Sequence, residues 1–198
     1  MNGRWEDETD EELMRWVADG NVRAFDQLFC RRRHAVYCFA YRMLQDHDLA
    51  EDVTQECFLR VWRARRRYRP TSAVRTWLFT ITRRLCLDQI RRQSREVEIS
   101  LDASEGDAPI GYESVGFPAN PEQIVLSREM FQVVNEAMDQ LPPLLREVVL
   151  LRETEEMSYE QIAAVIERPV GTVRSRLSAA RKRLRLAALQ WMGCDDQS

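Results

Sequence analysis

The stretch SYEQIAAVIERPVGTVRSRLSAARKRLR, residues Ser158–Arg185, decides how the carboxyl-terminal part of this chain folds. Ser158 and Gln161 have the spacing of a capping box, and apolar residues follow them at helical intervals. Pro169 interrupts the pattern, because the residue before a proline is pushed out of helical geometry. A second helix then begins near Gly171. A helix, a tight turn and a second helix predict a helix-turn-helix.

The second helix of this motif has two different faces. At 100° per residue, its apolar residues Val173, Leu177, Ala180 and Leu184 fall within one narrow arc. Small polar residues lie opposite them and arginines flank both sides, with no acidic residue from 168 to 185. Small outward residues let a helix approach base edges in a major groove, while flanking arginines reach phosphates. An ordinary solvated basic helix is the alternative. The expected duplex contacts are Thr172, Arg174, Ser175, Arg176, Ser178, Ala179, Arg181 and Lys182.

Charge is spread unevenly along the 198 residues, although the formal net charge is only -3. The run from Arg60 to Arg95 is rich in arginine, and its only acid is Asp88. Residues Glu96–Glu122 contain acids but no Lys or Arg, and Gly, Pro and Asn cluster between 102 and 121. The net charge therefore conceals two basic surfaces joined by a flexible acidic linker.

Helical periodicity dominates outside the linker, and no alternating strand pattern of convincing length is present. Thr9 with Glu12 and then Asn21 provide helix caps near the start. We predict an all-α fold of two small helical modules, residues 1–95 and 122–198, joined by the linker 96–121. Expected helices cover roughly 9–19, 21–44, 49–62, 76–92, 124–140, 143–153, 158–166 and 171–189. In the fourth, Trp77, Ile81 and Leu85 are expected to face inward.

Several function classes are not supported by the sequence. The acidic start MNGRWEDETDEEL is unlike a signal peptide, and no apolar run is long enough to cross a bilayer, so a cytoplasmic protein without membrane insertion is expected. The cysteines are Cys30, Cys38, Cys57, Cys86 and Cys194. They form no CxxC pair, so neither a disulfide framework nor a zinc knuckle is indicated. Cys30, His34 and Cys38 share one helix, but the two ends lie about 12 Å apart. We expect no metal and no cofactor.

Several segments resemble one known family. SYEQIAAVIERPVGTVRSRLSAARKRL is similar to the helix-turn-helix that reads the −35 promoter element in bacterial RNA polymerase sigma factors of the extracytoplasmic function (ECF) group. DLAEDVTQECFLRVW and TSAVRTWLFTITRRLCLDQIRR resemble the first module of that family, and QLPPLLREVVLLRETEEMSYEQIA also fits. The likeness extends over about residues 25–186 apart from the linker. Many relatives carry a bulky residue and then arginine where this chain has Ser178-Ala179, so the preferred promoter sequence stays open.

The resemblance implies a sigma factor, which binds core RNA polymerase and directs initiation at particular promoters without being an enzyme. It places the fourth helix and the loop before it at the −10 element, where the loop captures an unstacked base of the non-template strand. Basic grooves with aromatic pockets are suited to single strands. Tyr68 is the candidate aromatic, whereas Trp77 is assigned to the core. The expected −10 contacts are Tyr68, Arg69, Ser72, Arg75, Arg83, Arg84, Arg91 and Arg92.

A polar face on the third helix is formed by Glu51, Asp52, Gln55 and Glu56. Paired carboxylates would also suit acid–base catalysis or a metal, but no nucleophile motif or ligand pattern accompanies them. The alternative is a polar helix face that contacts only solvent and binds no partner. The resemblance implies docking on the β′ clamp helices of core polymerase, and contact of the second module with the β flap. An anti-sigma factor that masks the Glu51–Glu56 face is also expected.

In a sigma factor the linker must allow the two modules to reach both promoter elements. Elements one and a half to two DNA turns apart require the modules to separate by about 50–70 Å. A linker of about 25 extended residues reaches about 80 Å, which suffices.

The alternative function is a free-standing helix-turn-helix regulator that acts without polymerase. Such proteins usually dimerise on palindromic sites. A nucleic-acid-processing enzyme is a more distant third.

Overall fold

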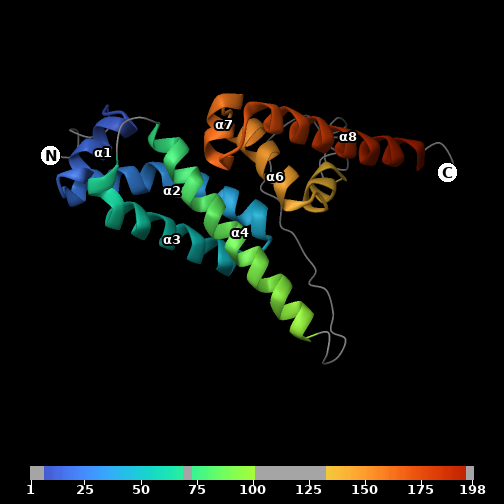
Figure 1. Ribbon diagram of the computed structural model, residues 1–198, viewed down its shortest axis with the longest axis horizontal. Coiled ribbons are helices and arrows are strands. Elements are labelled where there is room, and N and C mark those ends of the chain that lie inside the picture. Colours follow the sequence, from blue (N-terminus) through green and yellow to red (C-terminus); the bar gives the residue numbers. More distant parts are fainter. Residues whose placement is uncertain (1–6, 69–72, 101–132, 195–198) are drawn as a thin grey trace, which may run out of the picture.

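A computed structural model describes residues 7–68, 73–100 and 133–194, without the side chains of 96–100 and 191–194. Every element in these ranges is helical, and the helices form two groups (Figure 1). The all-α, two-module organisation predicted from the sequence is confirmed. The expected linker residues 101–121, and the −10 candidates Arg69 and Ser72, lie outside the described residues.

The first module consists of α1 (Asp10–Ala18), α2 (Val22–Leu44), α3 (His47–Ala64), a 3-10 turn η1 (Arg65–Arg67) and α4 (Val74–Ser100). The expected caps are present: Thr9 and Glu12 form a capping box, and the Asn21 side chain accepts from the Ala24 amide. Burial of apolar faces of these helices against one another forms the core of the module.

The buried face of α4 differs from the one expected. Leu78, Phe79 and Cys86 are fully or almost fully buried, while Trp77 and Ile81 are only half-buried at the edge of the core. Leu85 is buried as expected. The prediction placed the centre of the inward arc about one residue too early, because α4 packs against both α2 and α3 and therefore buries a broader face. Helix α4 also begins earlier and continues to Ser100, beyond the expected linker start at Glu96.

The second module comprises a helical segment at 133–139, α6 (Pro143–Val149), a π-helical turn η2 (Leu150–Thr154), α7 (Tyr159–Ile166) and α8 (Val170–Cys194). Ser158 and Gln161 form the predicted capping box of α7. Glu167 ends that helix in the left-handed conformation, with φ 55°, so the chain turns sharply before Pro169 and enters α8. The helix-turn-helix is thereby present where the sequence predicts it.

The two modules are packed against each other. Figure 1 shows α7 beside the amino-terminal part of α4, and α6 also contacts α2. Arg146 of α6 is buried at this junction, where it donates to the carbonyls of Met43 and Leu141 at 3.1 and 3.2 Å. Because those carbonyls lie at or just beyond helix ends, one guanidinium satisfies backbone groups of both modules.

Candidate nucleic-acid interface

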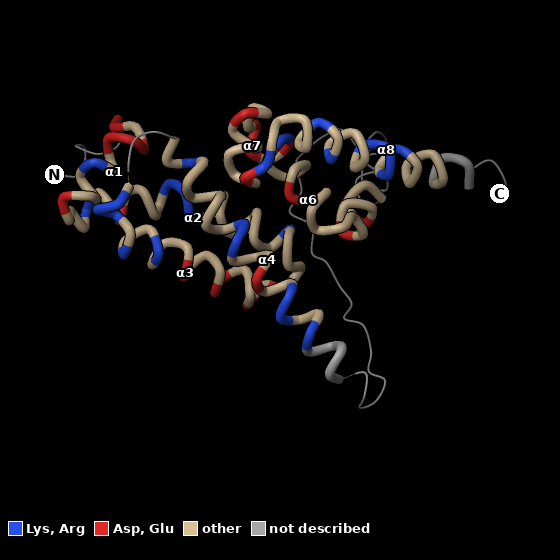
Figure 2. The backbone as a smooth tube through the Cα atoms, in the orientation of Figure 1, with Lys and Arg blue, Asp and Glu red and all other residues tan. Residues whose placement is uncertain are grey.

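Most of the residues predicted to contact duplex DNA lie on the exposed side of α8. Val173, Leu177 and Ala180 are buried against the module, which turns the opposite side of the helix to solvent. Figure 2 shows basic residues along the same helix. Small side chains between long cations suit a helix that approaches base edges. The exposed candidates are Arg174, Ser175, Ser178, Ala179, Arg181 and Lys182, and Thr172 is half-buried.

Arg176 lies differently from the other candidates on α8. Its side chain is only 18% exposed, and its Nη1 donates to Glu147 Oε1 at 2.7 Å. Its spacing of three residues from the buried Val173 and four from the buried Ala180 places it at the edge of the core. Arg181 remains exposed, but it donates to Glu153 at 2.9 Å. The sequence identified both arginines as candidates without showing that acids within the module hold them.

The arginines expected at the −10 element are also paired with acids. Arg83 donates to both carboxylate oxygens of Glu147, at 2.7 and 3.2 Å. Arg84 donates to Glu167, and Arg75 donates to the Glu155 carboxylate at 2.9 Å. All these acids belong to the second module, 64 to 83 residues further along the chain.

Two other −10 candidates lie nearer the carboxyl end of α4. Arg91 donates to Asp88 at 3.0 Å, and Arg92 is exposed. Figure 2 shows this basic stretch of α4 projecting beyond the packed helices. Its exposure leaves it accessible to the backbone of a nucleic acid.

An aromatic pair stands at the start of α4. The rings of Tyr68 and Trp77 have centroids 5.2 Å apart and are tilted by 40°. Both rings are half-buried against the core of the first module, and burial raises the pKa of the Tyr68 hydroxyl. The pair therefore provides a firm aromatic edge beside the loop expected to capture a base.

The polar face of α3 is largely solvent-exposed. Glu51, Asp52 and Gln55 are exposed, and Glu56 accepts from Arg60 at 2.8 Å. The hydrogen bond from Arg60 holds the pKa of Glu56 below its ordinary value. This face is therefore acidic in composition and accessible to a basic partner.

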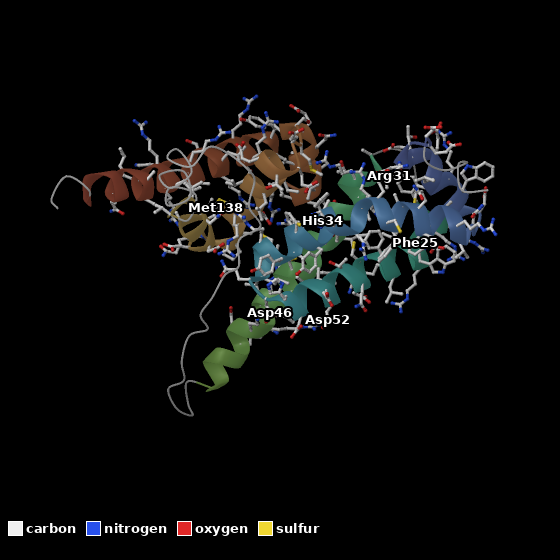
Figure 3. All side chains as sticks on the ribbon, turned by 180° about the vertical axis from the view of Figure 1, so that it is seen from behind. Phe25, Arg31, His34, Asp46, Asp52 and Met138 are labelled. Carbon is white, nitrogen blue, oxygen red and sulfur yellow. The ribbon has the colours of Figure 1, made fainter. Side chains whose placement is uncertain are left out.

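A cavity of about 380 Å³ opens beside that face, between α2 and α3. Figure 3 labels His34 of α2 and Asp52 of α3, which mark the two neighbouring helices. The contribution of α2 was missed from the sequence, although Arg33 and Tyr37 have the i, i+4 spacing of one helix face. The lining residues are Phe29, Arg33, His34, Tyr37, Glu51, Thr54 and Gln55.

The cysteine–histidine group on α2 is only partly assembled. Cys38 Sγ lies 3.4 Å from His34 Nε2, and Cys30 is exposed one turn earlier. In the part of the chain that the structure describes, no group of three or more His, Cys, Asp or Glu side chains is placed to hold a metal ion. Across the same residues, the helices are all too short or too polar to span a bilayer.

Comparison with known proteins now identifies the family. The family model "Sigma-70 region 2" matches residues 28–96, and "Sigma-70, region 4" matches residues 131–184. The ECF RNA polymerase sigma-E factor of Escherichia coli is 38% identical over 178 residues, covering 88% of this chain and 91% of that protein. The chain belongs to the ECF sigma factors of the sigma-70 family. The RNA polymerase sigma-H factor of Pseudomonas aeruginosa is 35% identical over 176 residues, with the same coverage of both chains.

Two solved structures resemble this sigma factor in fold. One is the sigma factor RpoE of Bartonella quintana in complex with the anti-sigma factor NepR, with a TM-score of 0.65, 29% identity and coverage of 82% and 95% of the two chains. The other is CnrH in complex with the cytosolic domain of CnrY, with a TM-score of 0.65, 25% identity and coverage of 96% and 100%.

Family membership settles the general activity. This sigma factor acts with core RNA polymerase and directs promoter-specific initiation through regions 2 and 4. It is not an enzyme, since sigma factors are initiation factors and polymerase performs the chemistry. The alternative of a regulator that works without polymerase is thereby replaced.

Proposed function

We propose that this sigma factor reads the −35 duplex with the exposed face of α8 and holds the opened −10 strand with α4 and the loop before it. The observation that supports the first part is the acid-free face on which Arg174, Ser175 and Ser178 are exposed while Val173 and Leu177 are buried. A helix presented in this way has short side chains toward the bases and cations toward the phosphates.

The −10 part of the proposal covers one continuous region of the first module. Tyr68 and Trp77 form its aromatic edge, and the arginines of α4 supply positive charge along the strand. Aromatic stacking together with backbone neutralisation is how single strands are held without a duplex partner. The proposed contacts are Tyr68, Arg69, Ser72, Arg75, Arg83, Arg84, Arg91 and Arg92.

The proposed polymerase contact is the α3 face formed by Glu51, Asp52, Gln55 and Glu56. Its charge and exposure fit the β′ clamp helices, and the second module is proposed to contact the β flap. We also propose an anti-sigma factor as a regulatory partner that masks the α3 face; the similar sigma factor RpoE of Bartonella quintana was solved in complex with the anti-sigma factor NepR. A pull-down from uninduced cells, followed by competition with core polymerase, tests that partner. Recovery of the protein only in free or polymerase-bound form would contradict it.

Run-off transcription on a promoter library, with purified core polymerase and this sigma factor, tests the main proposal. Selected promoters are expected to share two elements at a fixed spacing. Their transcription should require both the protein and core polymerase. Selection of a single element, or of a palindrome, would contradict the proposal that each module recognises its own promoter element.

A further inference from the structure

Helix α1 lies beside the part of the first module that is proposed to hold the −10 strand. Figure 1 shows it next to η1 and the amino-terminal end of α4, and it contacts both elements. The family model of sigma-70 region 2 begins at residue 28, so α1 lies outside the matched part of the chain. The contacts of α1 therefore indicate what this unmatched helix contributes.

One contact joins α1 to the first residue of α4. The Val74 amide donates to Glu11 Oε1 at 3.1 Å, although the two residues are 63 positions apart in the chain. Val74 is completely buried, and the first amides of a helix have no carbonyl partner within that helix. The carbonyl of Ala73 accepts from the Trp77 amide at 3.2 Å, but alanine has no side-chain oxygen with which to cap the helix. Glu11 therefore supplies from α1 the cap that Ala73 cannot provide.

The rest of α1 keeps Glu11 in a fixed position. The side chain of its neighbour Asp10 is only 5% exposed and accepts from Arg31 of α2 at 3.1 Å. A carboxylate at the amino terminus of a helix is also favoured by the helix dipole. Three apolar side chains of α1 are completely buried in the core, namely Leu13, Met14 and Val17.

The end of α4 that Glu11 caps also carries one half of the aromatic edge. Trp77 lies in the first turn of α4, and its ring centroid is 5.2 Å from that of Tyr68. Burial raises the pKa of the Tyr68 hydroxyl, and the negative charge of Glu11 adds to the rise. Glu11 is therefore near Tyr68 as well as bonded to the helix that carries Trp77.

We propose that Glu11 is a positioning residue for −10 recognition: it fixes the first turn of α4, and thereby the Tyr68–Trp77 edge, without contacting DNA itself. The proposal rests on the proposed role of this edge at the −10 element. The sign of the effect distinguishes positioning from simple electrostatics. A carboxylate that acted only through its charge would repel the phosphates of a bound strand, so its removal would strengthen binding. Removal of a positioning carboxylate weakens binding instead.

The test compares three variants of the full-length protein bound to core polymerase. Glu11→Ala removes the acceptor, whereas Glu11→Gln retains an oxygen that can accept from the Val74 amide. Asp7→Ala is the control, since it removes one exposed carboxylate four residues earlier. Fluorescence anisotropy measures affinity for a single-stranded −10 oligonucleotide and for a −35 duplex, both taken from a promoter selected in the run-off experiment.

Glu11→Ala is expected to weaken binding of the −10 oligonucleotide about three- to tenfold, in the range of the loss of one helix cap. Glu11→Gln and Asp7→Ala should bind it like the wild-type protein. Affinities for the −35 duplex and for core polymerase should be unchanged in all variants, since the surfaces proposed for them lie on α8 and α3. Equal or tighter −10 binding by Glu11→Ala would overturn the proposal, and so would an equal loss in Glu11→Gln.

A double-mutant cycle with Tyr68→Ala separates positioning from general destabilisation. If Glu11 acts through the aromatic edge, Glu11→Ala should change −10 affinity by less than about twofold in the Tyr68→Ala background. An undiminished loss in that background contradicts the proposal. Unchanged −10 affinity in Tyr68→Ala alone contradicts the proposed function of the edge, and this proposal with it. A loss in Tyr68→Ala without a loss in Glu11→Ala overturns only the inference about Glu11.

Hydrogen exchange provides a measurement without DNA. Exchange of the Val74 amide, followed by NMR, should be about tenfold faster in Glu11→Ala than in the wild-type protein and in Asp7→Ala, because the amide has lost its acceptor. Circular dichroism confirms that the variants are folded. An unchanged exchange rate in folded Glu11→Ala would show that this contact does not hold the start of α4, and would overturn the proposal.

Discussion

At the scale of single residues, neighbouring arginines on one helix have different surroundings. Arg174 is exposed on α8, whereas Arg176, two residues later, is bound to Glu147. Arg183 is exposed further along the helix. An arginine near the start of a recognition helix reaches base edges, and one near its middle reaches the phosphates at the groove wall.

Replacing these arginines by alanine should therefore have different effects. Arg174→Ala is expected to change selectivity at one or two −35 positions, by about 1–3 kcal/mol for a lost bidentate contact. Arg183→Ala should weaken binding to all promoters alike, because a phosphate contact carries no base information. Competition binding on a panel of single-base −35 variants measures both. An equal loss on every sequence for both mutants would contradict the proposed orientation of α8.

The thiols of this sigma factor also differ in environment. Burial raises the pKa of Cys57 to about 12, and it raises the pKa of Cys86 as well, whereas Cys30 is exposed. The thiolate is the reactive form, so alkylation at pH 8 should label Cys30 rapidly and leave Cys57 and Cys86 unlabelled until the protein unfolds. Peptide mass spectrometry after timed alkylation measures this.

Because an unfolded Cys57 ionises near its ordinary pKa of 9, its contribution to stability is complete below pH 9 and declines between pH 9 and about 12.

At the scale of helices, α3 separates its two functions by face. Val53, Cys57 and Phe58 pack into the core, while Asp52 and Gln55 remain exposed on the other side. Substitutions on the polar face should therefore alter docking without disturbing the core.

The variant Asp52→Arg with Glu56→Arg is expected to weaken binding to core polymerase at least tenfold, because like charges would face a basic partner. The control Asp19→Arg with Asp26→Arg makes the same change in net charge at two exposed sites, one directly after α1 and one in α2. Binding is measured by titration of labelled core polymerase, with circular dichroism to confirm helix content. Unchanged affinity in the folded variant would exclude this face as the docking site.

At the scale of the whole molecule, Arg146 connects parts of the chain that are about a hundred residues apart. It donates to Met43 at the end of α2 and to Met138 and Leu141 before α6. Buried carbonyls that lose such a donor become unsatisfied, and the cost falls on both modules.

Arg146→Met keeps most of the buried volume but removes these donors. It is expected to lower the free energy of unfolding by about 1–3 kcal/mol. Urea denaturation followed by circular dichroism measures the change. Arg168→Met, at an exposed site in the helix-turn-helix turn, serves as the control and should have little effect. Equal stability of the two variants would show that the Arg146 contacts contribute nothing.

The sequence by itself determined the helices and the helix-turn-helix, because the signals act over a few residues. The Ser158–Gln161 capping box and Pro169 define α7 and the turn within twelve residues of chain, and both appear in the structure as expected. The basic runs likewise identified the candidate nucleic-acid surfaces, since their charge is visible in composition alone.

The tertiary structure alone decided what those arginines bind. Glu147 pairs with Arg83 and Arg176, which are 64 and 29 residues away, and no local pattern indicates that these side chains meet. The inward face of α4 was also decided by packing, because two helices cover it and bury more than one narrow stripe. Charge could be located from the sequence, whereas its pairing depends on how helices distant in the chain pack together.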